Sequence, residues 1–411
     1  MKSIYDILKE RGFVEGGTDE NGLRGLLKSK KITCYIGFDP TGPSLHVGSL
    51  VPIMSLVHMQ RAGHRPIALV GGGTALIGDP SGRKEMRRTI TSEEVEENST
   101  KLKKQLSQYL DFGEGKALLL NNAEWLTTLN YIEFLRDIGR HFSVNRMLTA
   151  ESYRVRLDTG LNFVEFNYML LQAYDFLHLY QKHGCCLQMG GTDQWGNIVA
   201  GVDLIRRVEG GGAYGVVFPL VTTATGDKMG KTAQGAIWLD PERTSPYEYY
   251  QYWINVDDQD VERFLALLTL VPMEEVREYG GRKGADLRRS KEILAFEATK
   301  ITHGEEEAKR AREASRKAFA GEGESLEAIP TSFLEKERLA KGVLVFELFA
   351  ETGLCTSRGE ARRLISQGGG YINERRLNDL NERITKEDLK EGAIILRAGK
   401  KRYHRVVLKQ G

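Results

Sequence analysis

The sequence predicts an α/β domain built on a parallel sheet with a helical insertion, followed by an all-helical domain and a small α+β domain. Two observations predict this order. Short apolar runs alternate with helical patterns over residues 1–240, as in a parallel sheet covered by helices. Helical patterns alone follow over residues 245–320, and strand patterns return only after residue 343.

Length and composition agree with a soluble chain of several domains. The chain has 411 residues, which suggests about three domains at roughly 150 residues each. No apolar run approaches the roughly 18 residues of a membrane span, and the N-terminus lacks the apolar core of a signal peptide. We therefore expect a cytoplasmic protein without a membrane role. The 4 cysteines form no CxxC pair and have no histidine at ligand spacing, so no metal site or disulfide framework is expected.

Charge is unevenly distributed along the chain. The formal net charge is +2, but residues 356–411 hold 14 Lys and Arg against 7 Asp and Glu. This excess of +7 leaves −5 for the rest of the chain. A basic C-terminal module on an acidic body predicts a polyanionic partner for that module.

The first strand of the predicted sheet, residues 32–38, leads into a loop rich in Pro and Gly. Ser44 is a good N-cap, so we expect a helix from Leu45 to about Ala62 with His46 and Gly48 in its first turn. A helix start presents free N–H groups and a positive dipole end, and Gly48 lets a flat group approach the backbone. The stretch predicts a nucleotide site. The alternative is an ordinary strand–turn–helix with a surface histidine.

The other predicted strands of this sheet are residues 65–71, 116–121, 185–189 and 215–221, with helices over 92–110 and 193–208. Residues 123–180 are mostly helical and form the predicted insertion between the two halves of the sheet. The glycine-rich stretch after residue 71 is not a dinucleotide fingerprint, because Leu76 occupies the place of the third glycine.

The rest of the chain predicts helices over residues 246–266 and 290–320, a flexible linker over 321–342, and a last module over 343–411. That module has predicted helices at 343–352 and 357–367. Its predicted strands are 370–373, 393–398 and 402–408.

Three further patterns suggest chemistry. Tyr168, Gln172 and Asp175 fall on one face of a predicted helix, either as a pocket wall or as the polar stripe of a surface helix. Asp193 follows a strand end, where ligands often bind, although it could simply cap the next helix. The segment GDKMGKT, residues 226–232, holds Lys228 and Lys231 in a loop too short for a P-loop; a solvated basic turn is its alternative.

The tripeptide from His46 to Gly48 together with GDKMGKT resembles the two signature motifs of class I aminoacyl-tRNA synthetases, and most closely those of the bacterial tyrosyl-tRNA synthetase family. Residues 356–368, TSRGEARRLISQG, resemble the S4 RNA-binding domain. The resemblance implies a Rossmann-like catalytic domain over 1–240, a helical anticodon-region domain over 245–320 and an S4-like domain over 343–411. It also implies a homodimer formed through the insertion, and tRNA(Tyr), L-tyrosine and ATP as partners.

The resemblance implies a tyrosine-tRNA ligase that makes tyrosyl-adenylate and then charges tRNA. In this reaction a carboxylate attacks the α-phosphate of ATP, so cations must gather around the phosphates. Thr41 and His46 are the expected fixed hydrogen-bond donors. The expected cations are Lys228, Lys231, Arg83 and Arg87, and Thr232 ends the lysine motif. Mg²⁺ is expected on the ATP phosphates, with no dedicated protein metal site.

The binding residues implied by the resemblance fall into three groups. Tyr35 and Asp175 would bind the phenolic hydroxyl of tyrosine, Tyr168, Gln172 and Asp79 its ammonium, and Gln194 its carboxylate region, with Gln188 in support. The ATP residues would be Gly37, Asp39, His46, Gly48, Asp193 at the ribose, Lys228 and Lys231. The RNA contacts would come from Arg358, Arg362, Arg363, Lys400, Lys401, Arg402 and Arg405.

The sequence departs from the family pattern at two places. Ser49 stands where the first motif usually ends in histidine, so the ribose contact of that histidine is not assigned to Ser49. Gly230 and Thr232 stand in place of serines in the lysine motif. Two alternatives to the ligase are a catalytically silent RNA-binding relative and a tryptophan-specific relative. Tyr35 and Asp175, which suit a phenol, oppose the second.

Overall fold

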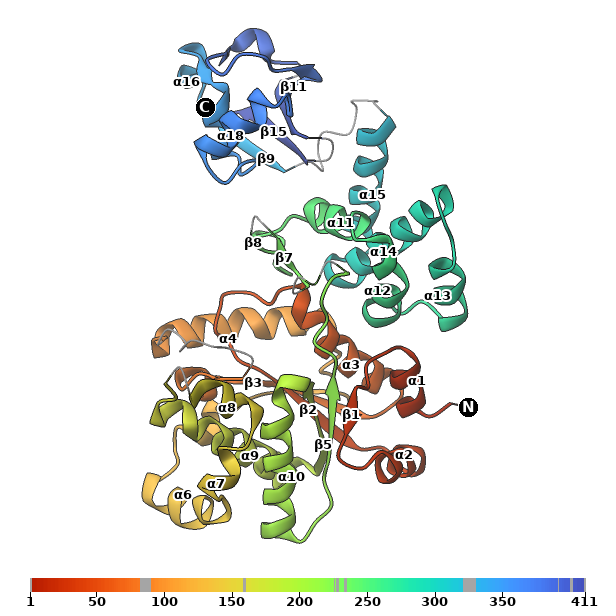
Figure 1. Cartoon of the computed structure of the whole chain (residues 1–411), viewed down its shortest axis with the longest axis vertical. Coiled ribbons are helices and arrows are strands. Elements are labelled where there is room, and N and C mark those ends of the chain that lie inside the picture. Colours follow the sequence, from red (N-terminus) through yellow and green to blue (C-terminus); the bar gives the residue numbers. More distant parts are fainter. Residues whose placement is uncertain are drawn as a thin grey trace.

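The computed structural model describes residues 2–81, 90–157, 160–224, 226, 229–232, 235–320, 330–390, 392–399 and 402–409. Arg83, Arg87, Lys228, Lys400 and Lys401 lie outside the described residues, and only the backbone is described at Lys231 and Thr232. The α/β part, the helical part and the C-terminal module follow one another along the long axis of the molecule (Figure 1). Among the described residues, no helix is long and apolar enough to cross a membrane.

The central sheet has the strand order β1 (Gly16–Gly17), β6 (Tyr214–Phe218), β5 (Cys185–Gly191), β2 (Thr33–Phe38), β3 (Arg65–Val70) and β4 (Leu118–Asn121). All neighbours are parallel except β1, which is antiparallel to β6. β3 and β4 extend the sheet on one side of β2, whereas β5 and β6 extend it on the other. The strand order therefore reverses between β2 and β5, which is where open α/β sheets bind ligands.

Both faces of the sheet are buried, which explains the continuous apolar runs of its central strands. Cys34 and Ile36 pack with α3 (Leu50–Arg61) on one face, whereas Tyr35 packs with α9 (Phe163–His183) on the other. Helices α1 (Ile4–Glu10) and α2 (Glu20–Ser29) join the α3 side, and α10 (Trp195–Glu209) joins the α9 side. The alternation of a strand thus aims Tyr35 at α9.

The predicted helical insertion contains α5 (Ala123–Leu126), α6 (Tyr131–Asp137), α7 (Val144–Met147), α8 (Glu151–Leu157) and α9. Asn162 caps the start of α9 by accepting from the backbone N–H of Glu165, and Gly184 ends it in the left-handed conformation. Arg156 and Glu165 form an ion pair of 2.9 Å with both side chains buried, which fixes α8 against the first turn of α9.

The helical part holds α11 (Pro246–Ile254), α12 (Val261–Leu268), α13 (Met273–Gly280), α14 (Ala285–His303) and α15 (Glu305–Ala320). The single helices predicted over 246–266 and 290–320 are wrong. Asp257 caps a new turn that separates α11 from α12, and Gly304, at φ 89°, separates α14 from α15. These helices share one apolar core with the α3 side of the sheet, so the two parts pack together.

The C-terminal sheet has the order β12 (Arg375–Arg376), β11 (Gly370–Ile372), β14 (Ala393–Ala398), β15 (Arg402–Leu408) and β9 (Thr331–Leu334). Helices α16 (Lys336–Ala340), α17 (Val345–Glu351) and α18 (Arg358–Ser366) accompany it, with a small pair β10 (Val343–Leu344) and β13 (Arg383–Ile384). The linker predicted over 321–342 is therefore too long. β9 pairs with β15, and Leu334 and Leu339 lie in the core of this module, so the module begins before residue 343.

Candidate active site

The first motif begins differently from the prediction. Ser44 is not an N-cap: its hydroxyl donates to the Leu45 carbonyl at 2.7 Å and accepts from Gln105 at 2.9 Å. His46 is the cap instead, because its Nδ1 accepts from the Gly48 N–H at 3.0 Å and starts a short 3₁₀ turn, Val47–Ser49, ahead of α3. A neutral ring that accepts at Nδ1 carries its proton on Nε2, so His46 can donate from Nε2.

The lysine loop packs directly on this turn. The backbone of Val47 donates to Ile237 at 3.0 Å, and Ile237 donates to Gly230 at 2.9 Å. Gly230 has φ 81°, and a Cβ placed on it would lie 2.2 Å from a methyl of Val47. Close approach to the first motif therefore requires glycine at this position of the lysine motif. Beyond it, Lys231–Thr232 and Gly235–Ala236 form a short hairpin, β7 and β8.

One cavity at the carboxyl ends of β2 and β5, with a volume of about 350 Å³, brings together the predicted tyrosine residues and the predicted ATP residues other than Lys228 and Lys231. This cavity, here called the central cavity, is lined by Tyr35, Gly37, Asp39, Thr41, His46, Gly48, Asp79, Tyr168, Gln172, Asp175, Gln188, Asp193 and Gln194, and Ser49 also lines it. The positions lie far apart in the sequence, and the fold converges them at the strand-order reversal. The substrate atom that each residue holds stays a prediction.

Tyr35 and Asp175 are buried residues that line the central cavity. Tyr35 is 1% exposed, and among the described residues its hydroxyl has no hydrogen-bond partner. Asp175 accepts from Asn122 at 2.8 Å and from the Trp125 indole N–H at 2.7 Å. Burial raises the pKa of Asp175 from 3.8 to about 7, although the two donors lower it.

Sequence reasoning missed Asn122 and Trp125. Asn122 directly follows β4 at the carboxyl edge of the sheet, and that place was a usable signal. Trp125 had no comparable signal, because it lies in the helical insertion. Its indole stacks on His178 with ring centroids 4.2 Å apart and an interplanar angle of 14°, which holds the N–H toward Asp175.

The polar residues of α9 face the cavity. The surface-stripe alternative is wrong, because Tyr168 is 5% exposed and Asp175 is 2% exposed. The Tyr168 hydroxyl donates to Asp39 at 2.8 Å, and Asp39 also accepts from Thr74 at 2.8 Å. Asn122 donates to Thr74 at 3.0 Å, so hydrogen bonds connect Asp39 to Asp175 across the cavity.

A second network lies at the end of β5. Gln194 donates to Asp79 at 2.8 Å, and Asn197 donates to Gln172 at 3.0 Å and to Gln194 at 3.1 Å. Gln188 is buried, and its Oε1 has no hydrogen-bond partner among the described residues. The cap alternative for Asp193 is wrong: Asp193 lies within the 3₁₀ turn Thr192–Gln194, and Gln194 precedes α10.

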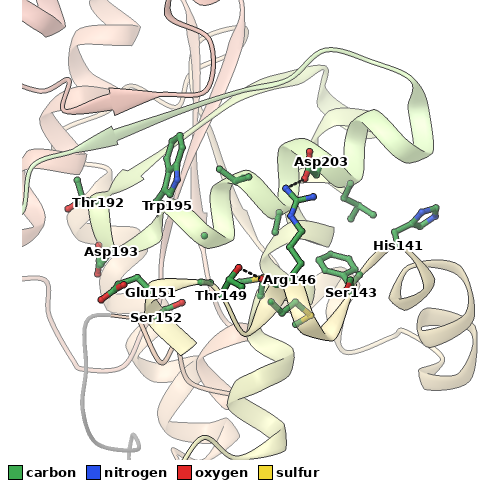
Figure 2. Close-up of a pocket in the computed structure, with 18 of the residues that line it drawn as sticks. His141, Ser143, Arg146, Thr149, Glu151, Ser152, Thr192, Asp193, Trp195 and Asp203 are labelled. Carbon is green, nitrogen blue, oxygen red and sulfur yellow. Dashed lines mark hydrogen bonds and ion pairs between the residues drawn. The ribbon is translucent and has the colours of Figure 1, made fainter. Parts of the chain in front are cut away.

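A larger cavity of about 730 Å³ adjoins the central cavity at Asp193 and runs along α10 (Figure 2). We call it the α10 groove. Trp195 lies near the Asp193 end and is 41% exposed, and Arg146, paired with Asp203 at 2.5 Å, lies further along. Arg207 also lines this groove. No sequence signal predicted it, because its two walls come from the insertion and from α10.

Among the described residues, no group of three or more His, Cys, Asp or Glu side chains could hold a metal ion. The described lining of the central cavity offers hydrogen-bond donors and separate carboxylates, which suit an organic substrate better than a bare cation.

Comparison with known families gives two matches that together span most of the chain. Residues 27–320 match the family "tRNA synthetases class I (W and Y)". Residues 324–406 match "Tyrosine--tRNA ligase SYY-like C-terminal domain". The division between these two matches lies close to the start of β9.

Curated relatives are similar over their full length. A tyrosine-tRNA ligase of Desulfatibacillum aliphaticivorans is 57% identical over 427 residues, covering 99% of each chain. One of Syntrophus aciditrophicus (strain SB) is 58% identical over 421 residues, covering 98% of each chain. Among solved structures, a C-terminally truncated mitochondrial tyrosyl-tRNA synthetase of Aspergillus nidulans has a TM-score of 0.70 at 30% identity, covering 77% of this chain and 94% of that one.

Proposed function

This chain belongs to the class I tyrosyl-tRNA synthetase family and is a tyrosine-tRNA ligase, and from that premise we propose that the central cavity makes tyrosyl-adenylate from tyrosine and ATP. The observation that carries the proposal is the buried hydroxyl of Tyr35, without a partner among the described residues, in a cavity shared with Asp175. A buried polar pair of this kind suits a substrate with a hydroxyl at its far end.

The phenol of tyrosine would enter the deep part of the cavity. Its hydroxyl would donate to Asp175 and bond to Tyr35, while Asn122 and Trp125 hold the carboxylate of Asp175 in place. A phenylalanine side chain would leave these buried groups unsatisfied, which costs about 1–3 kcal/mol for each group. This pair would therefore select tyrosine.

The amino-acid backbone would lie between α9 and β5. Asp79, Tyr168 and Gln172 would bind the ammonium, because they offer a carboxylate and neutral oxygens at one end of the cavity. Gln194 and Gln188 would lie near the carboxylate. Gln194 is tied to Asp79 at 2.8 Å, so ammonium and carboxylate binding would be coupled through one hydrogen bond.

ATP would lie across the ends of β2 and β5. Gly37, Asp39 and Gly48 would contact the nucleotide, and Asp193 would accept from the ribose hydroxyls. Thr41 and the Nε2–H of His46 would donate to phosphate oxygens. Charge moves onto pyrophosphate in the transition state, so Lys228, Lys231, Arg83 and Arg87 would act there as cations, with Thr232 beside them. Mg²⁺ would arrive on the ATP phosphates and neutralise part of their charge.

The α10 groove would receive the 3′ end of tRNA in the second step. The end of the RNA must reach the adenylate, and the groove shares Asp193 with the lining of the central cavity. Trp195 offers a ring on which an unpaired base can stack, and Arg207 offers a cation for its phosphates. Trp195→Leu should slow tRNA charging without slowing adenylate formation, whereas Trp195→Phe should keep both. A loss of adenylate formation would contradict this role.

The C-terminal module would bind the body of tRNA. The basic residues Arg358, Arg362, Arg363, Arg402 and Arg405 lie in α18 and β15, and Lys400 and Lys401 belong to the same basic sequence. Contacts from these residues to phosphates would make RNA binding fall steeply with salt.

We further propose that the chain forms a homodimer through its insertion, and that it acts in the cytoplasm, where tRNA is charged for translation. The described insertion exposes large apolar side chains: Ile132 is 69% exposed, Phe163 is 66% exposed and Val144 is 56% exposed. Exposed apolar groups gathered in one segment suit a second copy of the chain. Sedimentation velocity should give a dimer, and replacing Phe163 and Val164 by Ser should shift it toward monomer; a monomeric parent would refute the proposal.

Exchange of pyrophosphate into ATP, measured with each of the twenty amino acids, tests the proposed chemistry. Only tyrosine should support rapid exchange, and tRNA(Tyr) should then accept the tyrosyl group. Exchange driven by tryptophan, or none at all, would contradict the assigned pocket.

A further inference from the structure

The C-terminal sheet has one covered face and one open face. Ile372, Leu396 and Val406 point into the apolar core that α17 and α18 complete. The alternate residues of the same strands point the other way, and apart from the buried Ala393 they are partly or fully exposed. At its edge strand β9 this open face presents Phe333, which is 68% exposed.

A row of aromatic and arginine side chains crosses the open face. Cross-strand pairing places Arg376 beside Tyr371, Tyr371 beside Arg397, and Arg397 beside Tyr403. The Arg397 guanidinium lies 3.7 Å from the centroid of the Tyr371 ring and 5.9 Å from that of the Tyr403 ring. Arg397 therefore holds two rings that lie two strands, or about 10 Å, apart.

The charged strand residues of the open face are all arginines. None of the residues in the five strands of the C-terminal sheet is Asp or Glu, whereas Arg376, Arg397 and Arg405 all belong to the open face. The buried Nε of Arg405 has no hydrogen-bond partner among the described residues. Tyr403 also lines a cavity of about 680 Å³ between the C-terminal module and the helical part, and Glu248, Asp257 and Asp260 of the helical part line the same cavity.

We infer that this open face binds unpaired RNA bases, which stack on Tyr371 and Tyr403 while the arginines meet the adjoining phosphates. Sheet faces that carry exposed rings among cations are a known way to hold single-stranded RNA, because every base has a face that can stack. The inference rests on the proposed RNA-binding role of the C-terminal module. It adds a base-binding surface on the side of the sheet opposite α18.

Full-length variants test the inference. Replacing Tyr371 and Tyr403 together by Leu should weaken binding of a tRNA(Tyr) transcript by about 5-fold to 100-fold, because stacking is lost. The slope of log affinity against log salt should stay the same, since no charge is removed. Tyr371→Phe with Tyr403→Phe should bind like the parent, because the rings remain. Tyr279→Leu, which removes another tyrosine packed against an arginine, at 4.6 Å, is the matched control and should not change binding.

Two further measurements separate stacking from misfolding. All variants should keep the parent rate of tyrosine-dependent pyrophosphate exchange. The double Leu variant should also lose affinity for an unstructured RNA 12-mer by a similar factor, yet bind a 12-base-pair RNA duplex like the parent. If the double Leu variant bound the transcript and the 12-mer as tightly as the parent does, the inference would be overturned, and a protein partner would be the better occupant of the face. Equal losses in the Phe and Leu variants would also overturn it. If the parent itself binds no tRNA, the proposed RNA role of the whole module fails as well.

Discussion

Tyr35→Phe should make the tyrosine-free protein more stable while it weakens the selection of tyrosine. The Tyr35 hydroxyl is buried and has no hydrogen-bond partner among the described residues. Removing an unsatisfied buried hydroxyl relieves about 1–3 kcal/mol, so the melting temperature should rise by about 2 °C or more. The same change removes the proposed hydrogen bond to the substrate hydroxyl, worth about 1 kcal/mol, so the ratio of kcat/KM for tyrosine over phenylalanine should fall about 5-fold.

Discrimination between tyrosine and phenylalanine through the substrate hydroxyl is already known for this enzyme family. The test is therefore whether the melting temperature rises while the specificity ratio falls. Melting should be followed without substrates, and exchange should be measured with both amino acids. Tyr153→Phe is the matched control, because the equally buried Tyr153 hydroxyl donates to the Phe166 carbonyl at 2.7 Å. That variant should lose about 1 kcal/mol of stability. If Tyr35→Phe destabilised the protein as Tyr153→Phe does, or left the specificity ratio unchanged, the assignment of Tyr35 to the substrate hydroxyl would be refuted.

Four other changes have distinct expected outcomes. Burial raises the pKa of Asp175 in the folded chain to about 7, so the folded chain holds a proton that the unfolded chain releases near pH 4. The contribution of this group to stability therefore falls as the pH rises from 4 to 7. The melting temperature of Asp175→Asn should depend less on pH over this range than that of the parent. Gly48→Ala should slow pyrophosphate exchange more than it weakens tyrosine binding, because the new Cβ would lie 2.6 Å from the His46 ring; equal losses would contradict a nucleotide role. Lys231→Ala should slow adenylate formation on the order of 10²-fold, about 3 kcal/mol, with tyrosine affinity kept in equilibrium dialysis. A chain ending at Ala320 should keep pyrophosphate exchange yet fail to charge tRNA, and normal charging would remove the RNA role of the C-terminal module.

The fold could be predicted from the sequence where a single periodicity continues over one element. The strands β2, β3 and β5 were found within a few residues, because a fully buried strand is apolar throughout and is bounded by Gly, Pro and polar residues. The predicted helix boundaries were wrong where a single residue interrupts a helical pattern. Asp257 and Gly304 divide helices that are continuous by composition, and β1, made of two glycines, has no apolar signal.

The linker error has a related cause. Residues 331–334 include a buried Leu334 but also polar positions, and only pairing with β15 makes them a strand. A short edge strand has little intrinsic preference of its own, so the neighbouring strand decides its structure.

The sequence by itself determined the family, the two signature motifs and the residue types that adenylate formation needs, because these depend on local spacing and on the chemistry of side chains. The tertiary structure alone decided which of those residues share a cavity, since Tyr35, Asp79, Asp175 and Gln194 meet only where the strand order reverses. It also decided that Asn122 and Trp125 hold Asp175, that Gly230 lies against Val47, and that Arg397 lies between Tyr371 and Tyr403. Contacts of this kind join positions distant in the chain, and no local pattern encodes them.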